Sequence, residues 1–114
     1  MHRTAAATPS AMATTYAGRT RSWSELKERI ARMAGALQAL GVKSGDRVAV
    51  LAMNSDNYVE LYFAVVWAGA VIVPMNIRWS VPEHIYSIRI PGRGAVRGRR
   101  LPQGGASCAT RAIP

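Results

Sequence analysis

The chain of 114 residues has one cysteine, few acidic residues and no long apolar run. Cys108 therefore has no partner for an internal disulfide, and it has no metal ligands at a useful spacing. A reducing, cytoplasmic location is the expectation that follows. The longest apolar run, Leu61–Met75, contains Gly69 and Pro74 and falls short of the roughly 20 residues that a transmembrane helix needs. The sequence therefore predicts no transmembrane segment.

Acidic residues are missing from one part of the chain altogether. Residues 1–86 hold all six Asp and Glu and nine of the fifteen Lys and Arg, a balance of +3. Residues 87–114 hold the other six basic residues, all Arg, and no acid. This change in composition predicts a folded part, 1–86, and a basic, disordered tail, 87–114.

A basic tail is compatible with binding to nucleic acid or to an anionic membrane. However, no aromatic residue follows Tyr86 to stack on bases, and no amphipathic period indicates a membrane-facing helix. Charge alone supports only non-specific binding. A small nucleic-acid-binding protein is therefore the less favoured alternative, and no specific nucleic-acid partner is expected.

The centre of the chain predicts a βαβ unit. Arg47–Met53 has the pattern of a buried strand, Asn57–Ala68 that of a helix ending at Gly69, and Ala70–Pro74 that of a second strand. Two strands joined by a crossover helix are parallel. The first strand is apolar almost throughout, which predicts that it is covered on both faces. One helix is expected on each side, Trp23–Leu40 on one and Asn57–Ala68 on the other.

A longer helix is predicted just before this unit, from Trp23 to Leu40. Ser22 and Glu25 have the spacing of a capping box, and Gly41 suits the position after the helix end. The apolar positions at helical spacing are Leu26, Ile30, Met33, Leu37 and Leu40, widened by Ala34. The basic positions on the opposite side, expected to be solvated, are Lys27, Arg29 and Arg32.

The flanking segments give weaker signals. Residues 1–12 are expected to form a loose lead, with a short helical turn as the alternative. Ala13–Ala17 and Arg19–Trp23 predict a small hairpin with Ala-Gly-Arg at its tip, or else irregular coil. Ser80–Glu83 again matches a capping box and predicts a helix that runs past Tyr86.

Three polar residues are candidates for the border of a ligand cleft. Asn54 follows the first parallel strand, and Asn76 and Arg78 follow the second. Open α/β sheets bind ligands beyond the carboxyl ends of their strands. The favoured alternative is that Asn54 or Ser55 caps the next helix and that Arg78 is solvated.

Several segments together resemble one family. They are Trp23-Ser24-Glu25-Leu26, Gly41–Ala49, Asn54-Ser55, Tyr62–Val73 with Trp67-Ala68-Gly69-Ala70, Val73–Asn76 and Ser80-Val81-Pro82-Glu83. Their order and spacing are similar to those of adenylate-forming acyl-CoA synthetases, closest to fatty-acid–CoA ligases. The resemblance covers about residues 3–86 and implies an α/β fold: a partial three-layer βαβ unit from the large N-terminal domain of these enzymes.

The resemblance implies a two-step reaction and a role in fatty acid metabolism. A carboxylic acid attacks the α-phosphate of ATP to give an acyl-adenylate and pyrophosphate, and coenzyme A then displaces AMP. The family's phosphate loop, magnesium-binding acid, ribose-binding aspartate and C-terminal lysine match no position here. No catalytic, cofactor-binding or metal-binding residue is therefore carried over, and the expectation is an inactive fragment that binds no ATP, magnesium or coenzyme A. The alternative is a structural or interaction fragment completed by another chain.

The tail does not resemble the family, and a frameshift would explain it. One permitted codon choice for residues 94–106, with its first base dropped, encodes VLFVDDAFPKAA, an apolar strand followed by an acidic turn. We therefore expect an insertion, deletion or sequencing error just after the codon for Tyr86. A fragment of this kind leaves strand edges and apolar helix faces uncovered, which predicts aggregation.

Overall fold

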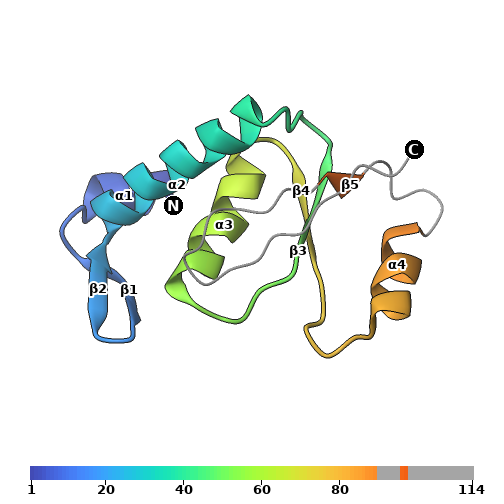
Figure 1. Cartoon of the computed structure of the whole chain (residues 1–114). Helices are drawn as coiled ribbons and strands as arrows, with labels where there is room; N and C mark the ends of the chain where they lie inside the picture. The colour runs from blue at the N-terminus through green and yellow to red at the C-terminus, as the bar shows by residue number, and fades with distance from the viewer. Residues whose placement is uncertain (90–95, 98–114) are drawn as a thin grey trace.

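The computed structural model describes residues 1–89 and 96–97, arranged as a hairpin, a small parallel sheet and four helices (Figure 1). The elements in chain order are α1 His2–Ala7, β1 Met12–Tyr16, β2 Arg19–Ser22, α2 Trp23–Ala39, β3 Arg47–Val50, α3 Asp56–Trp67, β4 Val71–Pro74, α4 Val81–Arg89 and β5 Val96–Arg97.

The predicted hairpin is confirmed. Strands β1 and β2 pair antiparallel, with Tyr16 opposite Arg19. Ala17 and Gly18, between them, have φ angles of 48° and 76°. Two central residues with positive φ make the turn type that matches the twist of a two-residue hairpin. The segment before it forms helix α1, of which Ala5 is buried, so the short helical alternative for the lead is correct.

Helix α2 begins at the predicted capping box. The Ser22 hydroxyl accepts from the Glu25 amide at 3.3 Å, and the Ser22 amide donates to Glu25 Oε2 at 2.7 Å. These two bonds satisfy amides that the first helical turn leaves without intrahelical partners. The helix ends one residue before Leu40, and Leu40 is exposed, so its predicted place in the apolar stripe is wrong.

The parallel βαβ unit is also confirmed. Strand β3 pairs with β4 in parallel, with Val48 opposite Ile72, and helix α3 connects them. The first strand is shorter than predicted, because it ends at Val50 rather than Met53. Helix α3 ends close to the turn before β3: a Cβ added at Gly69, whose φ is +82°, would lie 3.2 Å from Ser44 Oγ. Gly69 thus suits both the left-handed backbone and this close approach.

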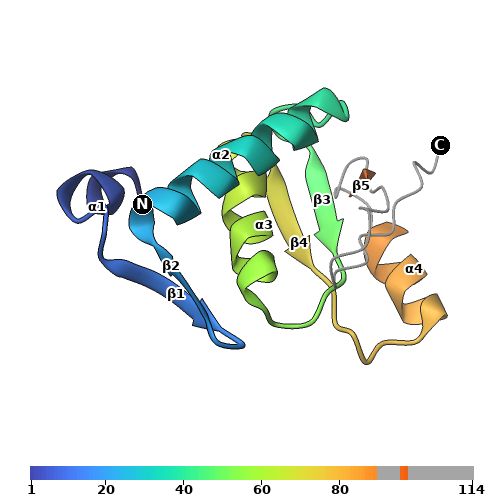
Figure 2. The ribbon, with the colours of Figure 1, turned by 60° about the vertical axis from the view of Figure 1, so that its left-hand side comes forward.

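The two long helices lie on the same face of the sheet. Val48 and Val50 project from one face of β3, Ile72 is paired beside Val48, and all three pack in one core with Ile30 of α2 and Val65 of α3. Figures 1 and 2 show α2 packed across α3. The prediction that these helices cover opposite faces is therefore wrong. Hydrophobic periodicity shows which side of a helix is buried, but not which neighbour buries it.

The opposite face of β3 is also buried, as predicted, because Ala49 there is as inaccessible as its neighbours. In Figures 1 and 2, helix α4 lies beyond β3, on the side away from α3. The described residues thus form an α/β fold in which α2 and α3 cover one face of the sheet.

The predicted boundary at Tyr86 falls inside a helix. Helix α4 continues to Arg89, and Val96–Arg97 forms a short strand, β5, parallel to β3. The order of this sheet is β4-β3-β5. The remaining residues of the predicted tail, including Cys108 and most of the segment behind the frameshift hypothesis, lie outside the described residues.

The capping box makes the stability of α2 sensitive to acid. Hydrogen bonds from the Ser22 backbone and then its side chain lower the pKa of Glu25. A carboxyl with a lowered folded pKa stabilises the fold above its unfolded pKa of about 4.3, and this contribution is lost as the pH falls through the folded pKa. We expect the stability advantage of the native chain over Glu25→Gln to shrink below about pH 4.3.

Urea unfolding of both proteins between pH 6 and pH 3 measures this difference. Glutamine keeps the size of the side chain and removes only the charge. A difference in unfolding free energy that stays constant with pH would contradict this role of the Glu25 carboxylate.

Candidate functional site

The most deeply buried charged groups of the described residues are two carboxylates on α3. Asp56 and Glu60 lie four residues apart and thus on one side of the helix, and their exposed fractions are 4% and 0%. Ser55 positions the start of this helix, because its side chain accepts from the Tyr58 amide at 3.1 Å. A buried carboxylate is costly unless cations and hydrogen bonds compensate it, so its partners define this site.

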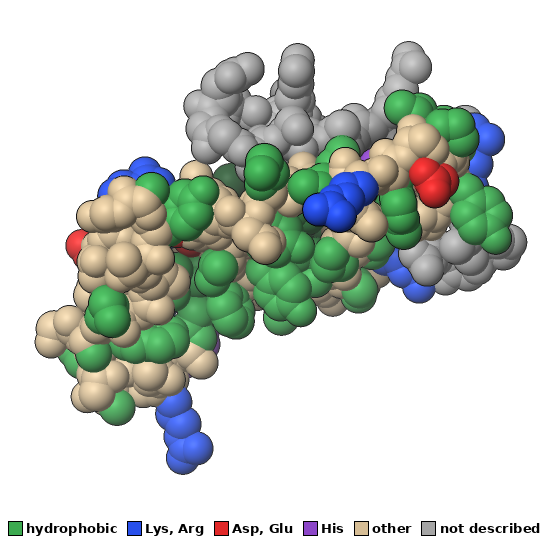
Figure 3. Space-filling model, turned by 90° about the horizontal axis from the view of Figure 1, so that it is seen from below, with side chains coloured by type: hydrophobic (Ala, Val, Ile, Leu, Met, Phe, Trp, Pro, Cys, Tyr) green, Lys and Arg blue, Asp and Glu red, His purple; other side chains and the backbone are tan. Residues whose placement is uncertain are grey.

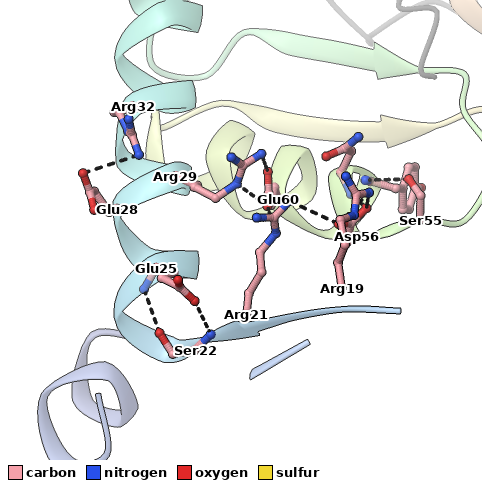
Figure 4. Close-up of polar contacts among 12 residues, drawn as sticks. Arg19, Arg21, Ser22, Glu25, Glu28, Arg29, Arg32, Ser55, Asp56 and Glu60 are labelled. Carbon is pink, nitrogen blue, oxygen red and sulfur yellow. Dashed lines mark hydrogen bonds and ion pairs between the residues drawn. The ribbon is translucent and has the colours of Figure 1, made fainter. Parts of the chain in front are cut away.

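Three arginines from two other elements supply that compensation (Figure 4). Arg29 of α2 binds Glu60 through two bonds, Nε to Oε1 at 2.6 Å and Nη2 to Oε2 at 2.9 Å. Arg21 of β2 bridges the two acids, with Nη2 3.3 Å from Asp56 Oδ2 and Nε 3.1 Å from Glu60 Oε1. Arg19 of β2 donates to Asp56 at 3.2 Å. We call these five residues the arginine–carboxylate cluster.

The cluster is suited to holding elements together rather than to acid–base chemistry. The hydrogen bond to Glu60 raises the pKa of Arg29 above its already high ordinary value, which keeps the guanidinium charged. The bidentate geometry occupies both oxygens of Glu60, and Asp56 also accepts from the Asn57 amide at 2.9 Å. The carboxylates therefore join the hairpin and α2 to α3 through charge-assisted hydrogen bonds.

Sequence reasoning missed this cluster, and the predicted solvated role of Arg29 is wrong. A usable signal was present: Asp56 and Glu60 are the only acids in a helix that is otherwise largely apolar. Acids in such a helix need basic partners when the helix is buried. Three arginines lie within residues 19–29, but their pairing with α3 depends on contacts more than 30 positions apart, which local patterns do not encode.

The candidate cleft residues all lie beyond the carboxyl ends of the parallel strands and are exposed. Asn54 follows β3, and Asn76 follows β4, where its Oδ1 accepts from the Arg78 amide at 2.9 Å. Ser55, rather than Asn54, caps α3, in agreement with the capping alternative for that position. A ligand cleft bordered by Asn54, Asn76 and Arg78 stays a prediction.

Among residues 1–89 and 96–97, no group of three or more His, Cys, Asp or Glu side chains is placed to hold a metal ion. Over the same part of the chain, no helix has the length and apolar character needed to cross a membrane.

The comparisons with known proteins decide the family. The model of the AMP-binding enzyme family matches residues 1–90. The chain belongs to the AMP-binding enzyme family. Among curated relatives, it is 47% identical over 81 residues to feruloyl-CoA synthase of an Amycolatopsis species, and 37% identical over 81 residues to 2-succinylbenzoate–CoA ligase of Arabidopsis thaliana. Each alignment covers 71% of this chain but only 16% and 14% of the respective enzyme.

Solved structures of AMP-binding enzymes share the fold. O-succinylbenzoate coenzyme A synthetase from Bacillus subtilis, in complex with ATP and magnesium ion, matches with a TM-score of 0.77 and 30% identity over 82% of this chain and 26% of that one. Fatty acyl-CoA synthetase of Mycobacterium tuberculosis matches with a TM-score of 0.73 and 30% identity over 76% of this chain and 18% of that one. The α/β elements described above are thus those of the N-terminal domain of adenylate-forming acyl-CoA synthetases.

The arginine–carboxylate cluster predicts unequal effects for two similar substitutions. Glu60→Gln removes the charge partner of Arg29 and Arg21, whose side chains are partly exposed, and should destabilise the chain by about 1–3 kcal/mol. Glu28→Gln removes an exposed pair on α2, in which Arg32 lies 3.4 Å away, and should cost less than about 0.5 kcal/mol. Urea unfolding followed by circular dichroism measures both values.

A double substitution checks that the loss comes from the pair itself. Combining Glu60→Gln with Arg29→Gln should cost less than the sum of the single changes, since both remove the same interaction. Equal losses for Glu60→Gln and Glu28→Gln, or strict additivity with Arg29→Gln, would contradict the cluster's role.

Proposed function

We propose that this chain supplies the opening scaffold of the catalytic domain of an ATP-dependent acid–CoA ligase. In the complete enzyme, a carboxylic acid and ATP give an acyl-adenylate and pyrophosphate, and coenzyme A then displaces AMP to give the acyl-CoA, with magnesium as the metal. The chain alone performs neither step. A cytoplasmic location fits these substrates.

The proposal rests on one observation: most of this chain matches the family, but the matched part is only a small share of a complete enzyme. The family match takes in residues 1–90, yet the aligned part is 16% of the feruloyl-CoA synthase. The described residues within this match place their buried charges in the arginine–carboxylate cluster, where Glu60 and Asp56 are engaged by arginines. They therefore contribute a packed βαβ unit, while the groups that act on ATP and on the acid belong to the rest of the enzyme.

The relatives support the reaction class more strongly than they support any one carboxylic acid as the substrate. Three relatives are named as ligases or synthases that join coenzyme A to different acids. They are feruloyl-CoA synthase, 2-succinylbenzoate–CoA ligase and the long-chain-fatty-acid–CoA ligase of Thermus thermophilus. We therefore assign a carboxylic acid as the substrate class of the complete enzyme.

A chimeric enzyme tests the proposal. In the Amycolatopsis feruloyl-CoA synthase, the segment that aligns with this chain over 81 residues is replaced by the aligned residues of the chain, and feruloyl-CoA formation is measured. If the segment is scaffold, the chimera should retain activity within about 100-fold of the parent, the loss expected when reacting groups shift by about 1 Å.

The matched control is the same enzyme with the segment deleted, which should be inactive. A chimera that is soluble and folded by circular dichroism, yet no more active than the deletion control, would contradict the proposal.

A further inference from the structure

The outer side of α3 is an apolar surface open to solvent. Tyr62, Phe63 and Val66 lie on one side of the helix, and their exposed fractions are 42%, 39% and 54%. The rings of Tyr62 and Phe63 meet edge to face, with centroids 5.9 Å apart. We call these three residues the α3 face. Figure 3 shows that hydrophobic side chains also gather across the middle of the underside of the molecule.

The sequence of α3 is that of a helix surrounded by protein. No charged residue occurs from Leu61 to Ile77, whereas the exposed side of the neighbouring helix α2 carries Glu28 and Arg32. The second half of α3, from Leu61 to Trp67, is therefore apolar on all sides, and such a helical segment is normally buried on all sides. Within the described residues, α2 and the sheet cover only the inner side of α3. The α3 face is therefore an apolar surface of the kind that further protein normally buries.

Within the described residues β4 is an edge strand of the sheet, and this edge is a poor alternative contact. The Val71 and Met75 amides donate to the Asp46 and Val50 carbonyls, on the β3 side. The backbone nitrogens of the alternate residues, Ile72 and Pro74, therefore face away from β3. Proline has no N–H, which blunts this edge against the addition of a long strand. A partner therefore has more to gain by packing on the α3 face than by extending the sheet.

We propose that the α3 face binds the remaining part of an adenylate-forming synthetase domain, and that it does so when this part is supplied as a separate chain. The inference rests on the proposed function. The occupant follows from the lengths of the relatives: the aligned region is 16% of the feruloyl-CoA synthase, so most of the domain that would pack against this unit lies in the other part of that enzyme. The fully buried core of a protein interface is more apolar than the rest of the surface, and the α3 face has this character.

Fragment complementation tests this inference. The full chain of 114 residues is co-expressed with an Amycolatopsis feruloyl-CoA synthase that lacks the segment aligned with this chain. Complex formation is measured by size-exclusion chromatography with light scattering, and dissociation constants by calorimetry. The expected result is a one-to-one complex with feruloyl-CoA synthase activity above that of either chain alone.

Variants of the α3 face identify the contact. Val66→Glu should weaken the complex at least about tenfold, because a charge then has to be buried in an apolar interface. Tyr62→Glu is the second variant, used if Val66→Glu changes the circular dichroism spectrum. The matched control is Ala36→Glu, on the exposed side of α2, which should leave the affinity unchanged.

Each other outcome overturns the inference. These outcomes are no complex, an insoluble truncated synthase in the presence of the native chain, a complex that neither α3 variant weakens, and self-association of the chain through the α3 face without binding the synthase. The single-chain chimera separates the two proposals: if it is active while the two separate chains do not associate, only the binding inference fails.

Discussion

The buried carboxylate of Glu60 is the constraint on which the arrangement of the described elements depends. With no exposed surface, it requires cationic partners at hydrogen-bond distance, and Arg29 and Arg21 bring these from α2 and β2. The hairpin and α2 are adjacent in sequence, but both must approach α3 from the side where Asp56 and Glu60 lie. Apolar packing stabilises the contact between the two helices, and the directional arginine bonds select their relative position.

Local patterns predicted much of this fold because local interactions produce it. The Ser22–Glu25 box, the helical spacing from Leu26 to Leu37 and the parallel βαβ unit all depend on residues close in sequence. The predictions failed where distant contacts decide. The helical pattern predicts a solvated Arg29, which instead binds Glu60. The apolar strand predicts α2 and α3 on opposite faces of the sheet, whereas they pack together on one face. Hydrophobic periodicity predicts which side of a helix is buried, but it does not predict which element covers that side.

The candidate site shows the same division. The predicted strands place Asn54 and Asn76 beyond the carboxyl ends of two paired strands, and the structure has them there. Both side chains are exposed, and Asn76 accepts from the nearby Arg78 amide, so neither gives evidence of a ligand. The resemblance to acyl-CoA synthetases came from several short segments in order, and the family match over residues 1–90 confirms it. Family membership was therefore predictable, whereas the structural use of the buried charges required the assembled fold.

If these residues are scaffold, as we propose, they carry none of the reaction chemistry. Pyrophosphate exchange into ATP tests it most directly, with the purified chain, magnesium and a panel of carboxylic acids that includes ferulate. We expect exchange no faster than in a blank without protein. Exchange above the blank that requires both the acid and the chain, and that persists after removal of trace contaminating enzymes, would contradict it.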